Sequence, residues 1–303
     1  KNCSKPTAKI VIINGFLTGY GDNLVGGSIF GVLVDFLNSR FSEVQIDVFI
    51  SANAEKSHDV LSRIPGINTV KVLPASVETL IEYDFFFDLT GMVGKMPHQP
   101  IQDSFLEQFG IDPASISPKN KRNTIEFEDD SYVDFILDQC KTGSNPLLLV
   151  QHRSSFPTRS IPDDKAVELV QAIIDKTGYN VITLYNLPIK HERFFPLTRL
   201  YKDFNRFASL IKKVDFLLSV DTSAYHLADI YNTKTLALFS TINPTNRISY
   251  YPTVVGLLIP EAEQSPIYGM NKGTKKEHFG EAERLWNGLN TDMVIRLINN
   301  TSV

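Results

Sequence analysis

Three segments of the chain carry residues that bind phosphate or transfer protons, and each follows a short apolar run. The first, residues 14–22, places three glycines ahead of one carboxylate, Asp22. Glycine lets a substrate approach the backbone, and a nearby carboxylate can accept a proton from it. Aspartate is also favoured at the start of a helix, so helix capping is the second interpretation of Asp22. The glycine spacing does not match a dinucleotide-binding fingerprint.

The second segment, residues 151–162, combines hydroxyl and guanidinium groups. It contains Arg153, Ser154, Ser155 and Arg159. Arginine offers bidentate hydrogen bonds and a fixed charge, so a strand-to-helix loop of this composition can hold a diphosphate. An ordinary basic surface loop has the same composition, and both interpretations stay open.

The third segment, residues 216–228, runs from an apolar strand into a helix that begins near Ser223. Hydroxyls and free backbone N–H groups at a helix N-terminus form an anion site, which suits a pyrophosphate. In the alternative interpretation, Asp221 and Thr222 only cap the helix and His226 packs in the core. A weaker candidate is the loop at residues 184–192, where Glu192 is an acid after a strand.

Short apolar runs that alternate with amphipathic stretches predict βαβ units and parallel sheets. Each candidate segment follows a predicted strand, where open α/β sheets bind their ligands. We expect two doubly wound halves joined by residues 111–146, and a last helix at about 280–298 that closes the second half or reaches back to the first. The predicted strands are 9–14, 45–50, 70–73, 85–88, 146–151, 180–184, 215–220 and 235–239. The predicted helices are 28–40, 132–140, 163–177, 204–212 and 225–231.

Composition excludes several classes of protein. The 303 residues carry a net charge of −4, which gives no overall field for nucleic acid, so we expect no nucleic-acid partner. The apolar runs are far shorter than the roughly 20 residues that cross a bilayer. The two cysteines, Cys3 and Cys140, form no metal-ligand spacing or disulfide framework. These features predict a cytoplasmic protein.

Taken together, the segments resemble glycosyltransferase family 9, the heptosyltransferase family of lipopolysaccharide biosynthesis. Residues 219–228 are similar to the family's Val-Asp-Thr-Gly-x-x-His-Leu-Ala signature, and Gly21-Asp22 resembles its Gly-Asp loop. Residues 65–70 and 83–91 resemble its N-terminal domain. Two departures are that Ser223 replaces the signature glycine and that Arg159 stands where a donor-binding lysine is usual.

The resemblance implies an α/β GT-B fold, in which two Rossmann-like doubly wound parallel-sheet domains face each other across a cleft. Residues 1–145 would bind the acceptor and residues 146–303 the nucleotide sugar. Asp22 would be the catalytic base. The donor-binding residues would be Ser154, Ser155, Arg159, Glu192, Asp221, Thr222, Ser223 and His226.

The implied activity is inverting, metal-independent transfer of heptose or a related sugar. The donor would be a nucleotide-diphosphate sugar such as ADP-heptose, with no cofactor and no metal site. The acceptor would be a hydroxyl of a glycan or glycolipid, such as the lipopolysaccharide core, reached from the inner face of the membrane by peripheral contact. Two alternatives are a hexosyl or N-acetylhexosaminyl transferase on the same fold, and a catalytically inactive nucleotide-sugar-binding protein.

Overall fold

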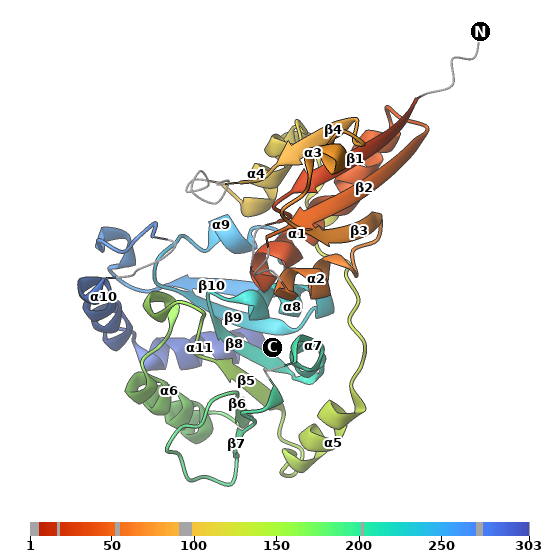
Figure 1. The fold of residues 1–303 in the computed structure, drawn as a ribbon. Helices are drawn as coiled ribbons and strands as arrows, with labels where there is room; N and C mark the ends of the chain where they lie inside the picture. Colours follow the sequence, from red (N-terminus) through yellow and green to blue (C-terminus); the bar gives the residue numbers. More distant parts are fainter. Residues whose placement is uncertain are drawn as a thin grey trace. The chain divides into compact units, whose positions relative to one another are not determined.

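The computed structural model describes residues 6–16, 19–51, 55–90, 99–200, 203–270 and 275–302. The chain divides into a first unit, residues 1–126, and a second unit, residues 127–303. Each unit is built on a parallel sheet of its own (Figure 1). The predicted α/β class with two parallel sheets is therefore confirmed. Cys3, and Leu17 and Thr18 of the glycine-rich loop, lie outside the described residues.

The first unit contains a four-stranded sheet in the order β3-β2-β1-β4. The strands are β1 (Thr7–Ile13), β2 (Glu43–Ile50), β3 (Ile67–Val72) and β4 (Phe85–Asp88). Its helices are α1 (Tyr20–Asn38), α2 (Glu55–Leu61), α3 (Val77–Leu80) and α4 (Ile101–Gln108), with 3-10 turns at Pro113–Ser115 and Pro118–Lys121. Phe16 lies at the centre of the core and makes edge contacts with the rings of Phe30, Phe105 and Phe109.

Helix α1 begins at Tyr20, so the start predicted near Ser28 is wrong. The sequence Gly26-Gly27 was interpreted as loop, but both glycines lie inside the helix for a tertiary reason. A Cβ on Gly26 would stand 1.9 Å from the ring of Phe16, and one on Gly27 would stand 2.6 Å from Ile125. The glycines therefore let α1 pack closely on its neighbours, and the longer helix places Asp22 in its first turn.

The second unit contains a six-stranded parallel sheet in the order β10-β9-β8-β5-β6-β7. The strands are β5 (Leu147–Gln151), β6 (Asn180–Thr183), β7 (Phe194–Pro196), β8 (Phe216–Val220), β9 (Lys234–Phe239) and β10 (Val254–Leu258). The helices are α5 (Ser131–Gln139), α6 (Asp163–Lys176), α7 (Phe204–Lys213), α8 (Ser223–Tyr231), α9 (Thr245–Ile248), α10 (Lys276–Asn287) and α11 (Thr291–Ser302). The 3-10 turns are Pro157–Arg159 and Ala262–Gln264.

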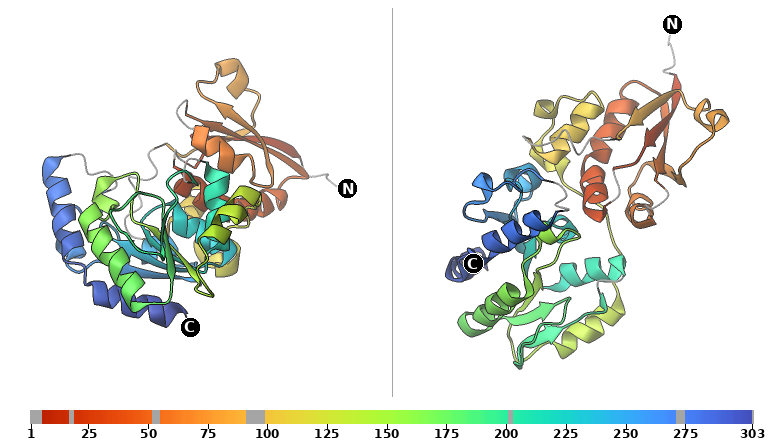
Figure 2. Two further views of the ribbon diagram at one scale, coloured as in Figure 1. Left: turned by 90° about the horizontal axis from the view of Figure 1, so that it is seen from below. Right: turned by 60° about the vertical axis from the view of Figure 1, so that its left-hand side comes forward.

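Alternate strand residues of this sheet bury on opposite faces. Leu236 and Leu238 of β9 join the cluster that contains the apolar side chains of α6, α10 and α11. The intervening Ala237 and Phe239 join a second cluster with Tyr225 of α8. Both faces are therefore covered by helices, as the ribbon of the second unit shows (Figure 2). This explains why β5, β6 and β8 are buried along their whole length.

Two predicted boundaries differ from the observed ones. The division at Glu126 and Phe127 comes earlier than the one predicted after residue 145, because α5 packs on α7 and the ring of Phe127 contacts that of Phe204. The single helix predicted at 280–298 is two helices, α10 and α11, separated at Gly288. Trp286 and Ile298 from these helices are buried in the core of the second unit, so they close that unit.

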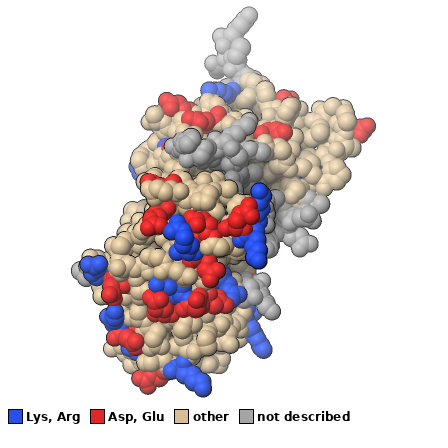
Figure 3. All heavy atoms as spheres, turned by 90° about the vertical axis from the view of Figure 1, so that its left-hand side faces the viewer, with Lys and Arg blue, Asp and Glu red and all other residues tan. Residues whose placement is uncertain are grey.

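Charges of both signs are mixed on the face of the molecule shown in Figure 3. In the second unit, ion pairs join Lys176 with Asp292, and Arg284 with Glu261 and Glu281. Within the described part of the chain, no helix has both the length and the hydropathy that crossing a bilayer requires.

Candidate active site

The sheet of the second unit has a switch point between β5 and β8. From β5 the chain adds β6 and β7 on one side, then returns to add β8, β9 and β10 on the other. The loops after β5 and β8 therefore leave in opposite directions and open a crevice at the carboxyl ends of these strands. They contain residues 152–162 and 221–222, the second and third segments that the sequence singled out.

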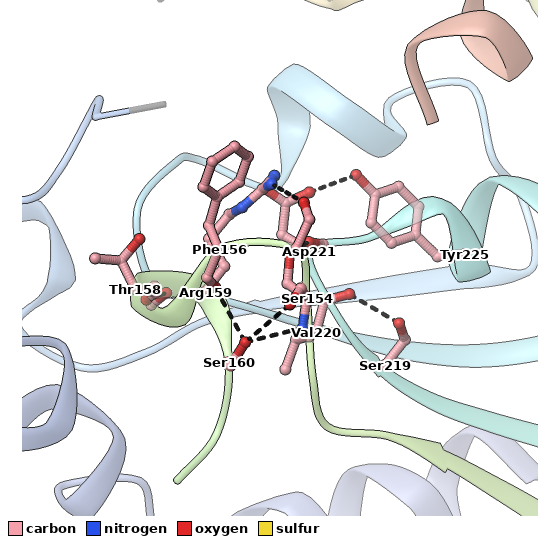
Figure 4. Close-up of polar contacts among 11 residues, drawn as sticks. Ser154, Phe156, Thr158, Arg159, Ser160, Ser219, Val220, Asp221 and Tyr225 are labelled. Carbon is pink, nitrogen blue, oxygen red and sulfur yellow. Dashed lines mark hydrogen bonds and ion pairs between the residues drawn. The ribbon is translucent and has the colours of Figure 1, made fainter. Parts of the chain in front are cut away.

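A buried ion pair joins these two loops. Nη1 of Arg159 donates to Oδ2 of Asp221 at 2.9 Å, and both side chains are largely buried. The hydroxyl of Ser154 donates to the backbone carbonyl of Asp221 at 3.0 Å, and the hydroxyl of Tyr225 donates to Oδ1 at 2.8 Å. Figure 4 shows Arg159 and Tyr225 reaching this carboxylate from opposite sides. Asp221 thus fixes the position of the guanidinium.

Opposing effects set the charge of Asp221. Burial alone raises the pKa of its carboxyl group. The nearby charges of Arg159 and Arg247, together with hydrogen bonds from Arg159 and Tyr225, lower that pKa to about 2. Asp221 is therefore ionised at neutral pH and keeps the guanidinium of Arg159 in place.

The loop after β5 is held by its own hydrogen bonds. The Ser160 hydroxyl accepts from the N–H of Ser154 at 2.9 Å and donates to the carbonyl of Phe156 at 3.0 Å. The hydroxyl of Ser240, after β9, donates to the carbonyl of Thr158 at 2.9 Å. Ser155 is exposed, and its Oγ lies 3.5 Å from Nη2 of Arg159. The loop therefore presents Arg159 and Ser155 from a preorganised backbone.

Helix α8 starts beside this ion pair. Its N-cap residue, Thr222, makes no side-chain cap hydrogen bond, and Asp221 bonds to Arg159 and Tyr225 instead. The interpretation that these two residues only cap the helix is therefore wrong. Thr222 and Ser223 are half-buried at the positive end of the helix dipole, where backbone N–H groups can bind an anion.

His226 lies deeper in the same helix and is packed. Its Nδ1 is 2.7 Å from the hydroxyl of Tyr251. Burial lowers the pKa of His226 to about 3, so the ring is neutral at physiological pH. This agrees with the interpretation that His226 packs in the core. His226 would then affect a bound ligand only indirectly, by holding α8 in position.

Asp22 lies at the corresponding place in the first unit. Strand β1 is flanked by β2 and β4, so the loop after β1 leaves at the switch point of this sheet. Asn14 and Gly15, with φ of 64° and 49°, turn the chain out of the strand toward α1. Gly19, not Asp22, is the N-cap residue, and Asp22 is half-buried in the first turn. A carboxylate is stabilised there by the helix dipole.

The sequence profile of glycosyltransferase family 9 (heptosyltransferase) matches residues 108–277, which is more than half of the chain. The chain belongs to glycosyltransferase family 9. It is therefore a heptosyltransferase-like glycosyltransferase. No match is found among curated proteins.

Solved structures of this family share the fold over nearly the whole chain. E. coli ADP-heptose lipopolysaccharide heptosyltransferase II is 15% identical, with a TM-score of 0.63 and coverage of 97% of this chain and 98% of that one. A family 9 glycosyltransferase from Veillonella parvula is 15% identical, with a TM-score of 0.64 and coverage of 99% and 98%. An E. coli heptosyltransferase solved with ADP is 13% identical, with a TM-score of 0.55 and coverage of 97% and 99%. The predicted GT-B fold is confirmed by these likenesses.

Glu192, a predicted donor-binding residue of this glycosyltransferase, lies at the amino ends of the strands, away from the other predicted donor residues. Phe194, the first residue of β7, pairs with Val181 near the start of β6, and the N–H of Val181 donates to the carbonyl of Arg193. Glu192 therefore precedes β7 at the amino ends of the strands, whereas Ser154 and Asp221 lie at the carboxyl ends. The loop after β6 runs from the carboxyl end of β6 to the amino end of the parallel strand β7. Glu192 is exposed at the end of this loop, and we leave it out of the proposed donor site.

Arg247 was not assigned to the site by sequence analysis. It lies in α9, and it lines a small pocket with Arg159 and Asp221. Its position could have indicated a role, because α9 follows β9 in the chain and β9 is the neighbour of β8 in the sheet.

Among the described residues, no three His, Cys, Asp or Glu side chains come together in a way that could hold a metal ion.

Proposed function

We propose that this family 9 chain transfers a heptose or related sugar from a nucleoside-diphosphate donor to a hydroxyl of a glycan acceptor, such as the lipopolysaccharide core. The observation that carries the proposal is the ion pair of Arg159 with Asp221 at the switch point of the second unit. A fixed guanidinium beside a helix N-terminus is suited to a diphosphate. ADP-heptose is the first donor to test, since relatives of the same fold include heptosyltransferases.

In the proposed mechanism Asp22 is the base. The acceptor oxygen attacks the anomeric carbon while the bond from that carbon to the diphosphate oxygen breaks, which inverts the configuration. The acceptor proton passes to the carboxylate of Asp22, and the leaving diphosphate keeps the bonding electrons. Arg159 and the first N–H groups of α8 stabilise its negative charge, so we propose that transfer proceeds without a metal ion.

A panel of donors tests this proposal. ADP-heptose, a UDP-hexose and a UDP-N-acetylhexosamine are each incubated with the protein and candidate acceptors, and release of nucleoside diphosphate is measured with and without EDTA. We expect product with ADP-heptose and no effect of EDTA. Thermal stabilisation of the protein by each nucleotide sugar is measured in parallel. If no member of the panel stabilises the protein or yields product, the proposal is wrong.

The same panel distinguishes the alternatives. Ser223 and Arg159 depart from the family pattern at two donor positions, and these departures favour testing hexose donors alongside heptose. Product from a UDP-sugar alone would identify a hexosyl or N-acetylhexosaminyl transferase. Stabilisation without product would identify a binding protein. Cytoplasmic location and peripheral membrane contact stay predictions.

A further inference from the structure

Arg247 is held in position by a close contact between α9 and β10. A Cβ on Gly256 would stand 2.5 Å from Pro244, the N-cap residue of α9, and 2.7 Å from Ile248, which follows Arg247. Glycine at this point of β10 therefore lets the short helix lie directly on the strand. Ile248 also packs against the apolar cluster that contains Tyr225 and Tyr251, which fixes α9 relative to α8.

The guanidinium of Arg247 is partly buried without a full set of partners. Its Nη1 is inaccessible to solvent, and among the described residues no group accepts a hydrogen bond from it. A buried donor left without an acceptor is costly, and the cost is greater for a charged group. A ligand that supplies the missing acceptor would account for this group.

The pocket around Arg247 has surplus positive charge. Arg159 and Arg247 both line it, and Asp221 is the acidic residue in its lining. Thr241 contributes to the wall, and its carbonyl accepts from the N–H of Gly269 at 2.6 Å, which closes the rim. Two guanidiniums around one carboxylate leave one positive charge unbalanced. That excess suits a ligand with several anionic oxygens.

We propose that Arg247 is a second cationic residue of the donor site, which with Arg159 grips the diphosphate of the donor and of the released nucleoside diphosphate. This inference rests on the proposed function, because it places the diphosphate beside Arg159. Arg247 completes a pair of guanidiniums that matches the two phosphate groups, and the ligand's oxygens accept from Nη1.

Calorimetric titration of the 303-residue chain with inorganic pyrophosphate and with ADP tests the inference. Charge-assisted hydrogen bonds contribute enough that Arg247→Ala should weaken both affinities about 10-fold or more. Arg247→Lys keeps the charge without the fork and should weaken them about 3-fold. Arg296→Ala is the matched control, since this arginine is exposed on α11, and it should bind both ligands as the wild type does.

Thermal unfolding without ligand separates binding from a structural role. Arg247→Lys keeps the positive charge that lowers the pKa of Asp221, so this variant should be as stable as wild type if Arg247 serves binding. A loss of stability in this variant, or an unchanged affinity of Arg247→Ala for pyrophosphate, overturns the inference. If pyrophosphate and ADP both bind through Arg247 while no nucleotide sugar yields product, the diphosphate site stands and the proposed transfer reaction is wrong. If wild type binds neither ligand, both are wrong.

Discussion

At the switch point of the second unit a buried carboxylate, Asp221, holds Arg159 between two loops, whereas at the switch point of the first unit Asp22 is half-buried in the opening turn of a helix. The second unit therefore presents guanidiniums at its switch point, and the first unit presents a carboxylate. Fixed positive charge stabilises a leaving diphosphate, and a carboxylate that solvent can reach is suited to accept a proton. The family profile covers residues 108–277, so it matches mainly the second unit.

The two sheets also differ in how deeply their strands are buried. In the second unit β5, β6 and β8 are buried throughout, whereas β4 of the first unit exposes Phe85 and Phe86. At the carboxyl end of β4, Asp88 and Thr90 form an exposed network with Asn14. Under the proposed function, the buried sheet would carry the donor site and the exposed polar groups of the first unit would be available to an acceptor. This difference suggests experiments on each unit.

The largest effect is expected at Asp22. Asp22→Asn preserves shape but removes the base, so turnover should fall about 100-fold or more while donor affinity stays unchanged. Steady-state release of nucleoside diphosphate measures the first quantity and calorimetry the second. Asp35→Asn, at an exposed position of the same helix, is the control. Turnover within a few-fold of wild type would remove Asp22 from this role.

Arg159→Ala should act on binding. We expect about 10- to 100-fold weaker affinity for the nucleotide sugar, because a charged hydrogen-bond donor is lost from a buried site. Calorimetric titration measures this change. Arg153→Ala is a matched control from the same loop, since that guanidinium pairs with Asp163 and lies over the ring of Tyr185. Equal losses in the two variants would show that general positive charge, not the geometry at Asp221, binds the donor.

Acid should destabilise the second unit through its buried histidines. Burial lowers the pKa of His226 to about 3, and burial with the charge of Arg153 lowers that of His152 to about 4. Between about pH 6.5 and these values the unfolded chain binds more protons than the folded chain. The free energy of unfolding therefore falls as the pH falls, by about 1 kcal/mol per pH unit for each histidine. Asp221 adds a further loss only below its unfolded pKa of about 3.9.

Fluorescence of Trp286, the single tryptophan, reports on this unit. In urea titrations at several pH values, the midpoint followed by Trp286 should fall as the solution is acidified from pH 6.5 to 4.5. His226→Gln, which keeps a polar partner for Tyr251, should make this dependence shallower. A midpoint that does not change with pH would contradict the assignment of neutral, buried rings.

The smallest effect is expected at Glu192. Because this residue lies at the amino ends of the strands, Glu192→Gln should change donor affinity and turnover by less than about 2-fold, as is usual for exposed sites away from a ligand. The same titrations measure it. A loss comparable to that of Arg159→Ala would show that the loop after β6 reaches the donor.

The sequence by itself predicted eight of the ten strands in the described residues, the two parallel sheets, and the segments at 151–162 and 216–228 as candidate phosphate-binding loops; β7 and β10 were not predicted. These features depend on local patterns: branched apolar runs predict strands, and Asp221-Thr222-Ser223 directly follows one of them. That β5 and β8 are neighbours, so that Ser154 and Asp221 meet at the carboxyl ends of their strands, is known only from the observed strand order.

Only the tertiary structure decided where α1 begins, on which edge Glu192 lies and that Arg247 lines the pocket. Each depends on contacts between residues far apart in sequence: Phe16 and Ile125 against the glycines of α1, the pairing of β7 with β6, and Gly256 beneath α9. Local propensity contains no information about such contacts, and close packing against a distant side chain can favour glycine inside a helix.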